Sequence, residues 1–64
     1  MENEVVSIMK NMERQFEEAA IDAQKFANGN NSAGTRVRKT MQNIKNLAQQ
    51  VRTEVQYQKN SVLA

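Results

Sequence analysis

The stretch Asn28-Gly29-Asn30-Asn31-Ser32-Ala33-Gly34 separates two segments that each carry a heptad pattern of apolar residues. The first pattern consists of Val5, Met9, Met12, Phe16, Ala19, Ala23 and Phe26. The second consists of Val37, Met41, Ile44, Ala48, Val51, Val55 and, after a polar position at Gln58, Val62. Alternating steps of three and four residues hold one side of a helix against a partner helix over many turns. The short gap therefore predicts an all-α fold, an antiparallel two-helix hairpin.

Residues that favour helix ends give the expected bounds within a single domain, 1–64: helix one at about 3–28, a turn at about 29–31 and helix two at about 32–60. Asn3 is a suitable N-cap for helix one, because its side chain can accept a hydrogen bond from the first turn. Gly29 suits the left-handed conformation that ends a helix. Helix two has three candidate caps, which are Asn30, Asn31 and Ser32.

Gly34 lies inside the expected first turns of helix two, where glycine costs about 1 kcal/mol relative to alanine. Two interpretations are equally favoured. Either the two backbones approach closely near the turn, or the start of the helix simply tolerates a glycine.

The composition argues against an enzyme. The chain contains no cysteine and no histidine, which excludes disulfides, Cys/His zinc sites and the usual catalytic triads. Its carboxylates fall on predicted helix surfaces, and no glycine-rich phosphate loop is present. The sequence therefore predicts no catalytic residue, no metal, no cofactor and no small-molecule substrate.

No stretch of the sequence is apolar enough to form a membrane helix, because charges interrupt every long segment. The start, Met1-Glu2-Asn3-Glu4, is acidic where a signal peptide has a basic region. The expected location is therefore the cytoplasm, without membrane association. A helix lying on a membrane surface is also a poor fit, since helix two lacks Trp and Phe.

Charge is divided unequally between the two halves. Up to Asn28 there are six acidic and three basic residues, whereas from Gly29 onward there are six basic residues and Glu54 alone. Such a division predicts attraction between the helices and leaves positive charge on helix two for an anionic partner.

Further apolar residues flank both heptad patterns: Val6, Ile8, Ala20, Ile21 and Ala27 in helix one, with Leu47 and Tyr57 in helix two. A two-helix hairpin buries only one narrow seam, so the wider pattern predicts a second contact surface. We expect a homodimer that forms a four-helix bundle. The alternative is that Ile21 and Leu47 are simply exposed, as single apolar residues often are. Residues equidistant from the turn should face each other, which predicts contact between Phe16 and Ile44.

Three cations crowd the start of helix two in Thr35-Arg36-Val37-Arg38-Lys39. The helix dipole already presents positive charge at that end, so these side chains favour a bound anion. Free backbone N–H groups there, with the side chains of Asn30 to Ser32 and Thr35, would suit a phosphate. The alternative is an ion pair between Arg38 and Asp22 or Glu18.

A second basic feature is the row Arg38, Lys45, Arg52 and Lys59, which recurs every seven residues beside the seam. We include Lys45 and Arg52 among the candidate nucleic-acid contacts. Flanking positions of paired helices more often hold interhelical ion pairs, and Glu13 or Glu17 could face Lys45.

The segment Gly29-Asn30-Asn31-Ser32-Ala33-Gly34-Thr35-Arg36-Val37-Arg38-Lys39 resembles the signature Gly-Asn-Lys-Ala-Ala-Gly-Thr-Arg-x-Arg-Lys of the bacterial linker-histone-like nucleoid proteins. The similarity continues more weakly through Ile44, Leu47, Ala48, Val51 and Arg52. The resemblance implies DNA association and chromosome compaction. Matched by position, it implies DNA contacts by Arg36, Arg38 and Lys39, supported by Asn30 and Thr35. Two departures are Asn31 in place of a lysine and the missing lysine- and alanine-rich tail of longer members. They predict DNA binding that is weak or shared with a partner.

Two functions thus remain open from the sequence. The first is a histone-like, nucleoid-associated protein that binds DNA through phosphates as a homodimer, without sequence preference. The second is a helical-hairpin interaction or scaffold module with no nucleic-acid role, which the acidic surface of helix one favours.

Overall fold

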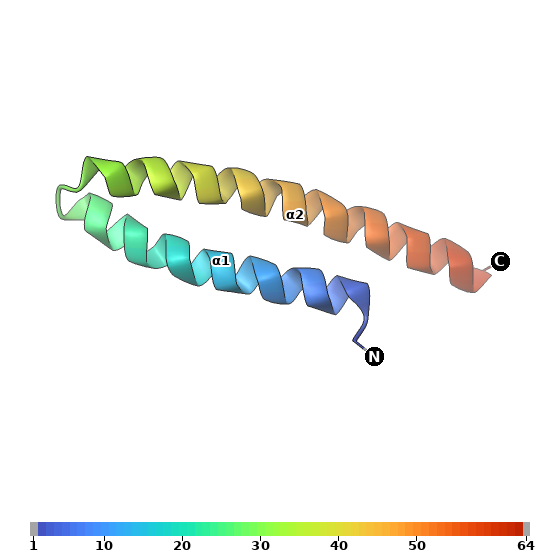
Figure 1. Ribbon diagram of the computed structural model, residues 1–64. Helices are drawn as coiled ribbons and strands as arrows, with labels where there is room; N and C mark the ends of the chain where they lie inside the picture. Colours follow the sequence, from blue (N-terminus) through green and yellow to red (C-terminus); the bar gives the residue numbers. More distant parts are fainter. Residues whose placement is uncertain (1, 64) are drawn as a thin grey trace.

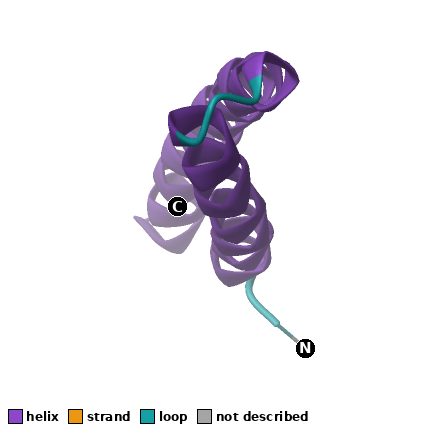
Figure 2. Ribbon diagram, turned by 90° about the vertical axis from the view of Figure 1, so that its left-hand side faces the viewer, coloured by secondary structure: helices purple, strands orange, loops and turns teal. Residues whose placement is uncertain are grey.

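The computed structural model describes residues 2–63, which form two α-helices joined by a tight turn (Figure 1). Helix α1 spans Glu4–Ala27 and helix α2 spans Asn31–Leu63. The helices run antiparallel, and the start of α1 and the end of α2 lie at the end remote from the turn (Figure 2). The molecule measures 53 × 20 × 11 Å, so it is elongated along the helices. The predicted all-α helical hairpin is confirmed, and α2 continues to Leu63, beyond its expected end near Asn60.

Local capping sets the start of each helix. Asn3 adopts an extended conformation, and its side chain accepts a hydrogen bond from the N–H of Val5 at 2.8 Å, as predicted. The side-chain oxygen of Asn30 accepts from the N–H of Ala33 at 3.1 Å, which makes Asn30 the cap among the three candidates for α2. Each cap satisfies an N–H group that has no partner within its own helix.

Gly29 ends α1 in the predicted left-handed conformation, with φ at 104°. The N–H of Gly29 donates to the carbonyl of Phe26 at 3.0 Å, and the N–H of Asn30 donates to the carbonyl of Lys25 at 3.0 Å. This pair of bonds is a Schellman motif, which satisfies the last carbonyls of the helix and reverses the chain. Only glycine reaches this φ without strain, so the turn depends on Gly29.

The seam between the helices differs from the predicted one on the side of α1. The side chains of α1 that lie against α2 are Val5, Ile8, Asn11, Met12, Gln15, Ala19 and Asp22, all buried or half-buried. Met9, Phe16, Ala23 and Phe26 are exposed instead, Phe16 to 61%. The prediction that these four residues lie in the seam was therefore wrong. Phe16 and Ile44 were expected to face each other within the seam, but they instead line one open groove.

The difference arises because two rows of residues on α1 share Val5, Met12 and Ala19, and either row could face α2. One row also contains Met9 and Phe16. The other also contains Ile8 and Gln15. The first row is the more apolar, but the structure turns the second toward α2. On α2 the predicted pattern holds better, because Val37, Ile44, Ala48, Val51 and Val55 are all half-buried. Met41 is exposed, and the side chain of Val62 lies outside the described part of the structure.

The hairpin buries little on its own. Among the described residues, the buried apolar side chains are Ile8, Ala19 and Ala33, and two of these are alanines. Apolar burial contributes roughly 25 cal/mol for each Å² removed from water, so three mostly small side chains provide limited stability. A chain of this size usually needs a further source of stability, such as oligomerisation.

Polar side chains join the two helices at the open end of the seam. Near the open end, the side-chain amides of Asn3 and Gln58 form two hydrogen bonds, one in each direction, at 2.8 and 3.0 Å. Gln58 also donates to a carboxylate oxygen of Glu54 at 3.1 Å. The polar position that interrupts the heptad pattern of α2 therefore has a partner in the N-cap residue of α1. We call the reciprocal pair of Asn3 and Gln58 the amide clasp.

Near the turn, the backbone of α2 passes close to Phe26. A Cβ built on Gly34 would lie 2.5 Å from Cδ1 of Phe26 and 2.7 Å from its Cε1. The structure thus shows a close approach at Gly34, but by the ring of Phe26 and not between the two backbones as the first interpretation had it.

This contact predicts coupled effects of substitutions at the two positions. Gly34→Ala alone should give no net gain in stability, because the better helix propensity is offset by displacement of the Phe26 ring. In a Phe26→Ala background, the same change should stabilise the protein by about 1 kcal/mol. Urea denaturation of the four proteins measures the coupling. Equal effects of Gly34→Ala in both backgrounds would show that the ring and Gly34 do not interact.

Candidate nucleic-acid interface

The candidate interface lies on α2 and begins beside the turn. From Gly29 onward the only acidic residue is Glu54, and its half-buried side chain accepts a hydrogen bond from Gln58 within the seam. Arg38, Lys39, Lys45 and Arg52 are all exposed. The solvent-facing surface of α2 therefore carries cations without interspersed carboxylates, which is the electrostatic requirement for binding a polyanion.

Arg36 is held by an ion pair across the hairpin. Its Nε and one terminal nitrogen lie 3.1 and 3.0 Å from the same carboxylate oxygen of Asp22. The side chain of Asp22 is 17% exposed and that of Arg36 is 49% exposed, so the pair lies at the edge of the seam. The sequence had suggested Arg38 as the partner of Asp22, and the structure places Arg36 there instead.

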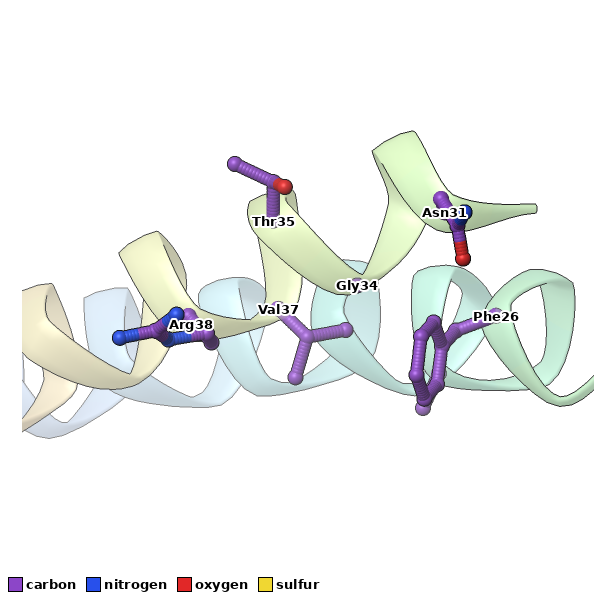
Figure 3. A pocket seen from close by; sticks show the side chains of 7 residues that line it. Phe26, Asn31, Gly34, Thr35, Val37 and Arg38 are labelled. Carbon is purple, nitrogen blue, oxygen red and sulfur yellow. The ribbon is translucent and has the colours of Figure 1, made fainter.

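Arg38 lies on a different side of α2, at an apolar hollow of about 460 Å³. The hollow is also lined by Phe26, Gly34 and Val37, and Figure 3 shows the Phe26 ring and the Val37 side chain on the same side of Gly34. The exposed aromatic ring of Phe26, in a hollow that Arg38 also lines, is a feature that sequence reasoning missed. It had assigned Phe26 to the seam, where the ring would have been covered.

The structure does not bring the three predicted cations together on one surface. Successive helix residues are about 100° apart, so Arg36 and Arg38 project to nearly opposite sides of α2. Lys39 lies between them on the exposed outer side. Arg38 instead shares a side with Lys45 and Arg52, at seven-residue spacing. A single anion therefore cannot contact all three cations, although an extended polyanion can follow the outer surface.

The two supporting residues have different surroundings. The oxygen of Asn30 is occupied by the N–H of Ala33, which leaves its amide nitrogen as the group that can donate to a phosphate. Thr35 is exposed and projects away from Phe26 (Figure 3). The predicted N-terminal phosphate seat is thus partly filled by the chain's own cap.

Within residues 2–63, no three His, Cys, Asp or Glu side chains lie close enough together to hold a metal ion. No helix in that range is both long and apolar enough to cross a membrane.

The described residues thus form an all-α hairpin whose second helix presents exposed cations. The profile of the family "Histone H1-like protein Hc1" matches residues 7–61, most of the chain, and the protein belongs to this family. It is therefore a histone-like, DNA-associated protein, in a family of DNA-packaging proteins and not of enzymes. A search of curated proteins found no match, and neither did a search of solved structures.

Proposed function

We propose that this histone-like protein binds duplex DNA through the phosphate backbone, without reading base sequence. The observation that carries the proposal is that Arg38, Lys39 and Arg52 are exposed on a helix whose one carboxylate, Glu54, is half-buried. Contacts of lysine and arginine with phosphates provide affinity by releasing counterions, and they carry no sequence information.

The cations are not equivalent in this proposal. Arg38 and Lys39 provide the principal contacts, because they are exposed beside the positive end of α2. Arg36 contributes less, since a phosphate must compete with the carboxylate of Asp22. Asn30 and Thr35 support phosphate binding as neutral donors near the turn. Lys45 and Arg52 extend the surface along the helix.

The protein acts as a homodimer in the nucleoid under this proposal. One hairpin offers few phosphate contacts, so a single copy binds weakly. Two copies double the contacts and raise the affinity through multivalency. A dimer also covers apolar side chains that the single hairpin leaves exposed on one side of α1, such as Phe16 and Met9.

A salt titration of binding to duplex DNA tests the proposal. We expect binding at low salt, with log affinity falling linearly against log salt at a slope of roughly −0.9 for each phosphate contact. Two duplexes of equal length and unrelated sequence should give the same affinity. Absence of binding at low salt would refute the proposal and favour the scaffold function, in which contacts such as Asp22–Arg36 serve only the hairpin.

A further inference from the structure

The two faces of the hairpin differ in chemistry. One face has an apolar groove of about 780 Å³, lined by Met9, Phe16 and Ile44 among others. It continues into the hollow beside Phe26 and Val37, because Phe16, Ala20 and Ala23 follow one side of α1. We call this surface, from Met9 to Phe26 on α1 and from Val37 to Ile44 on α2, the apolar face.

The opposite face is polar. Grooves on that side are lined by Ser7, Asn11 and Arg14 of α1 and by Gln50 and Glu54 of α2. On α1 these residues lie about half a helical turn away from Met9 and Phe16, with the seam between the two sets. The hairpin is thus a single layer with one polar face and one apolar face. A layer of this kind buries its apolar side against another layer.

The edges of the apolar face carry opposite charges. Glu13 and Glu17 line the groove along the α1 edge, where Lys10 is already paired with Glu2. Lys45 lies along the α2 edge, at seven-residue spacing from Arg38, which lines the hollow. Among the charged side chains that the structure describes, the ion pairs are Lys10–Glu2 and Arg36–Asp22, so Glu13, Glu17 and Lys45 are available to a partner. This surface is self-complementary for a second copy of the chain.

We propose that the apolar face is the contact surface of two copies, with α1 of each copy packed on α2 of the other and both turns at the same end. In this arrangement Glu13 and Glu17 of one copy lie level with Lys45 of the other. The levels correspond because Phe16 and Ile44 line the same groove and therefore lie at similar distances from the turn.

The reverse arrangement, with the turns at opposite ends, is electrostatically unfavourable. It packs α1 on α1 and α2 on α2. Glu13 and Glu17 of one copy then lie near the same two residues of the other, and Lys45 lies near Lys45. Like charges at close range along a helix interface are destabilising and select against a pairing.

The arrangement rests on the dimer proposed above and adds a consequence for DNA binding. It places Arg38 and Lys39 of both copies at one end of the bundle, beside the two turns. A duplex would then contact a doubled cationic end, and Lys45, which pairs across this dimer, would no longer be one of the phosphate contacts proposed above.

Spin labels measure the arrangement directly and without DNA. The chain has no cysteine, so Ser32→Cys provides one attachment site per copy, at an exposed position in the first turn of α2. Turns at the same end place the two labels within about 30 Å, a few interhelix spacings. Turns at opposite ends separate them by more than about 40 Å along the helices. Pulsed electron resonance distinguishes the two, and the longer distance would overturn the proposal.

A matched pair of variants tests the face itself. Phe16 and Ile21 are both apolar residues of α1 and both 61% exposed, but only Phe16 lines the groove. Phe16→Ala should raise the dimer dissociation constant at least about tenfold in sedimentation equilibrium, whereas Ile21→Ala should leave it nearly unchanged. Helical circular dichroism at high protein concentration shows that both variants fold.

A parent protein that sediments as a monomer, or two variants with equal effects, would refute the contact surface. None of these measurements includes DNA. If the salt titration shows no DNA binding, the tests of the dimer can still be interpreted. If the protein is a monomer, the salt titration still tests DNA binding.

Discussion

The double variant Arg38→Gln/Lys39→Gln is expected to lose most of its affinity for duplex DNA while keeping the helical hairpin. Both side chains are exposed and neither lies in the seam, so the fold does not depend on their charges. If each makes one phosphate contact, the slope of log affinity against log salt should become shallower by roughly 1.8. Fluorescence anisotropy of a labelled duplex over a range of salt concentrations measures both quantities.

A matched control removes the same charge from the other helix. Arg14→Gln/Lys25→Gln also lowers the net charge by two, but on α1 and outside both the apolar groove and the outer surface of α2. We expect a much smaller loss of affinity and an unchanged slope. The single change Arg36→Gln should lie between the two, because Asp22 already engages this guanidinium. Equal losses in both double variants would mean that net charge alone governs binding and that α2 is not the interface.

Ile8→Ala is expected to unfold the hairpin or nearly so. Ile8 is the largest of the buried apolar side chains among the described residues, and truncating a buried isoleucine costs about 2–5 kcal/mol. A domain of this size rarely has more than about 5 kcal/mol to lose. Thermal and urea melts followed by circular dichroism measure the change.

Ile21→Ala provides the same chemical change on the same helix at an exposed position. Its effect should remain within about 0.5 kcal/mol, as for most surface substitutions. If the two variants melt alike, then Ile8 does not contribute to the seam and α1 is turned differently from the structure described here.

Local features of this fold could be predicted from the sequence because they depend on neighbouring residues. Gly29 ends α1 through its backbone conformation, and Asn3 caps α1 through its own side chain. The rotation of α1 about its axis could not be predicted in the same way. Apolar content favoured Phe16 over Gln15 in the seam, but a second copy can cover Phe16, and the pattern of one chain does not separate the two contact surfaces.

The candidate site also combines a feature that the sequence predicts with one that it does not. The cations at the start of α2 are a property of the sequence, as is their crowding against the helix dipole. Their pairing depends on how the helices are aligned across the seam. Asp22 lies beside Arg36 and not Arg38, because it is in the seam and faces the side of α2 that carries Arg36. The DNA-binding roles of the seven candidate residues remain predictions.

The amide clasp has a consequence for the order in which the hairpin closes. It joins residues 55 apart in the sequence, whereas the ion pair of Asp22 and Arg36 joins residues only 14 apart. Closing the longer loop directly costs about 1 kcal/mol more in chain entropy, so closure starts at the turn and proceeds outward. During synthesis, the contacts near Gly29 can form before Gln58 has been added. In the finished protein, the same order makes the end with the clasp the first to open, and amide hydrogen exchange should therefore slow steadily from Val5 toward Ala19.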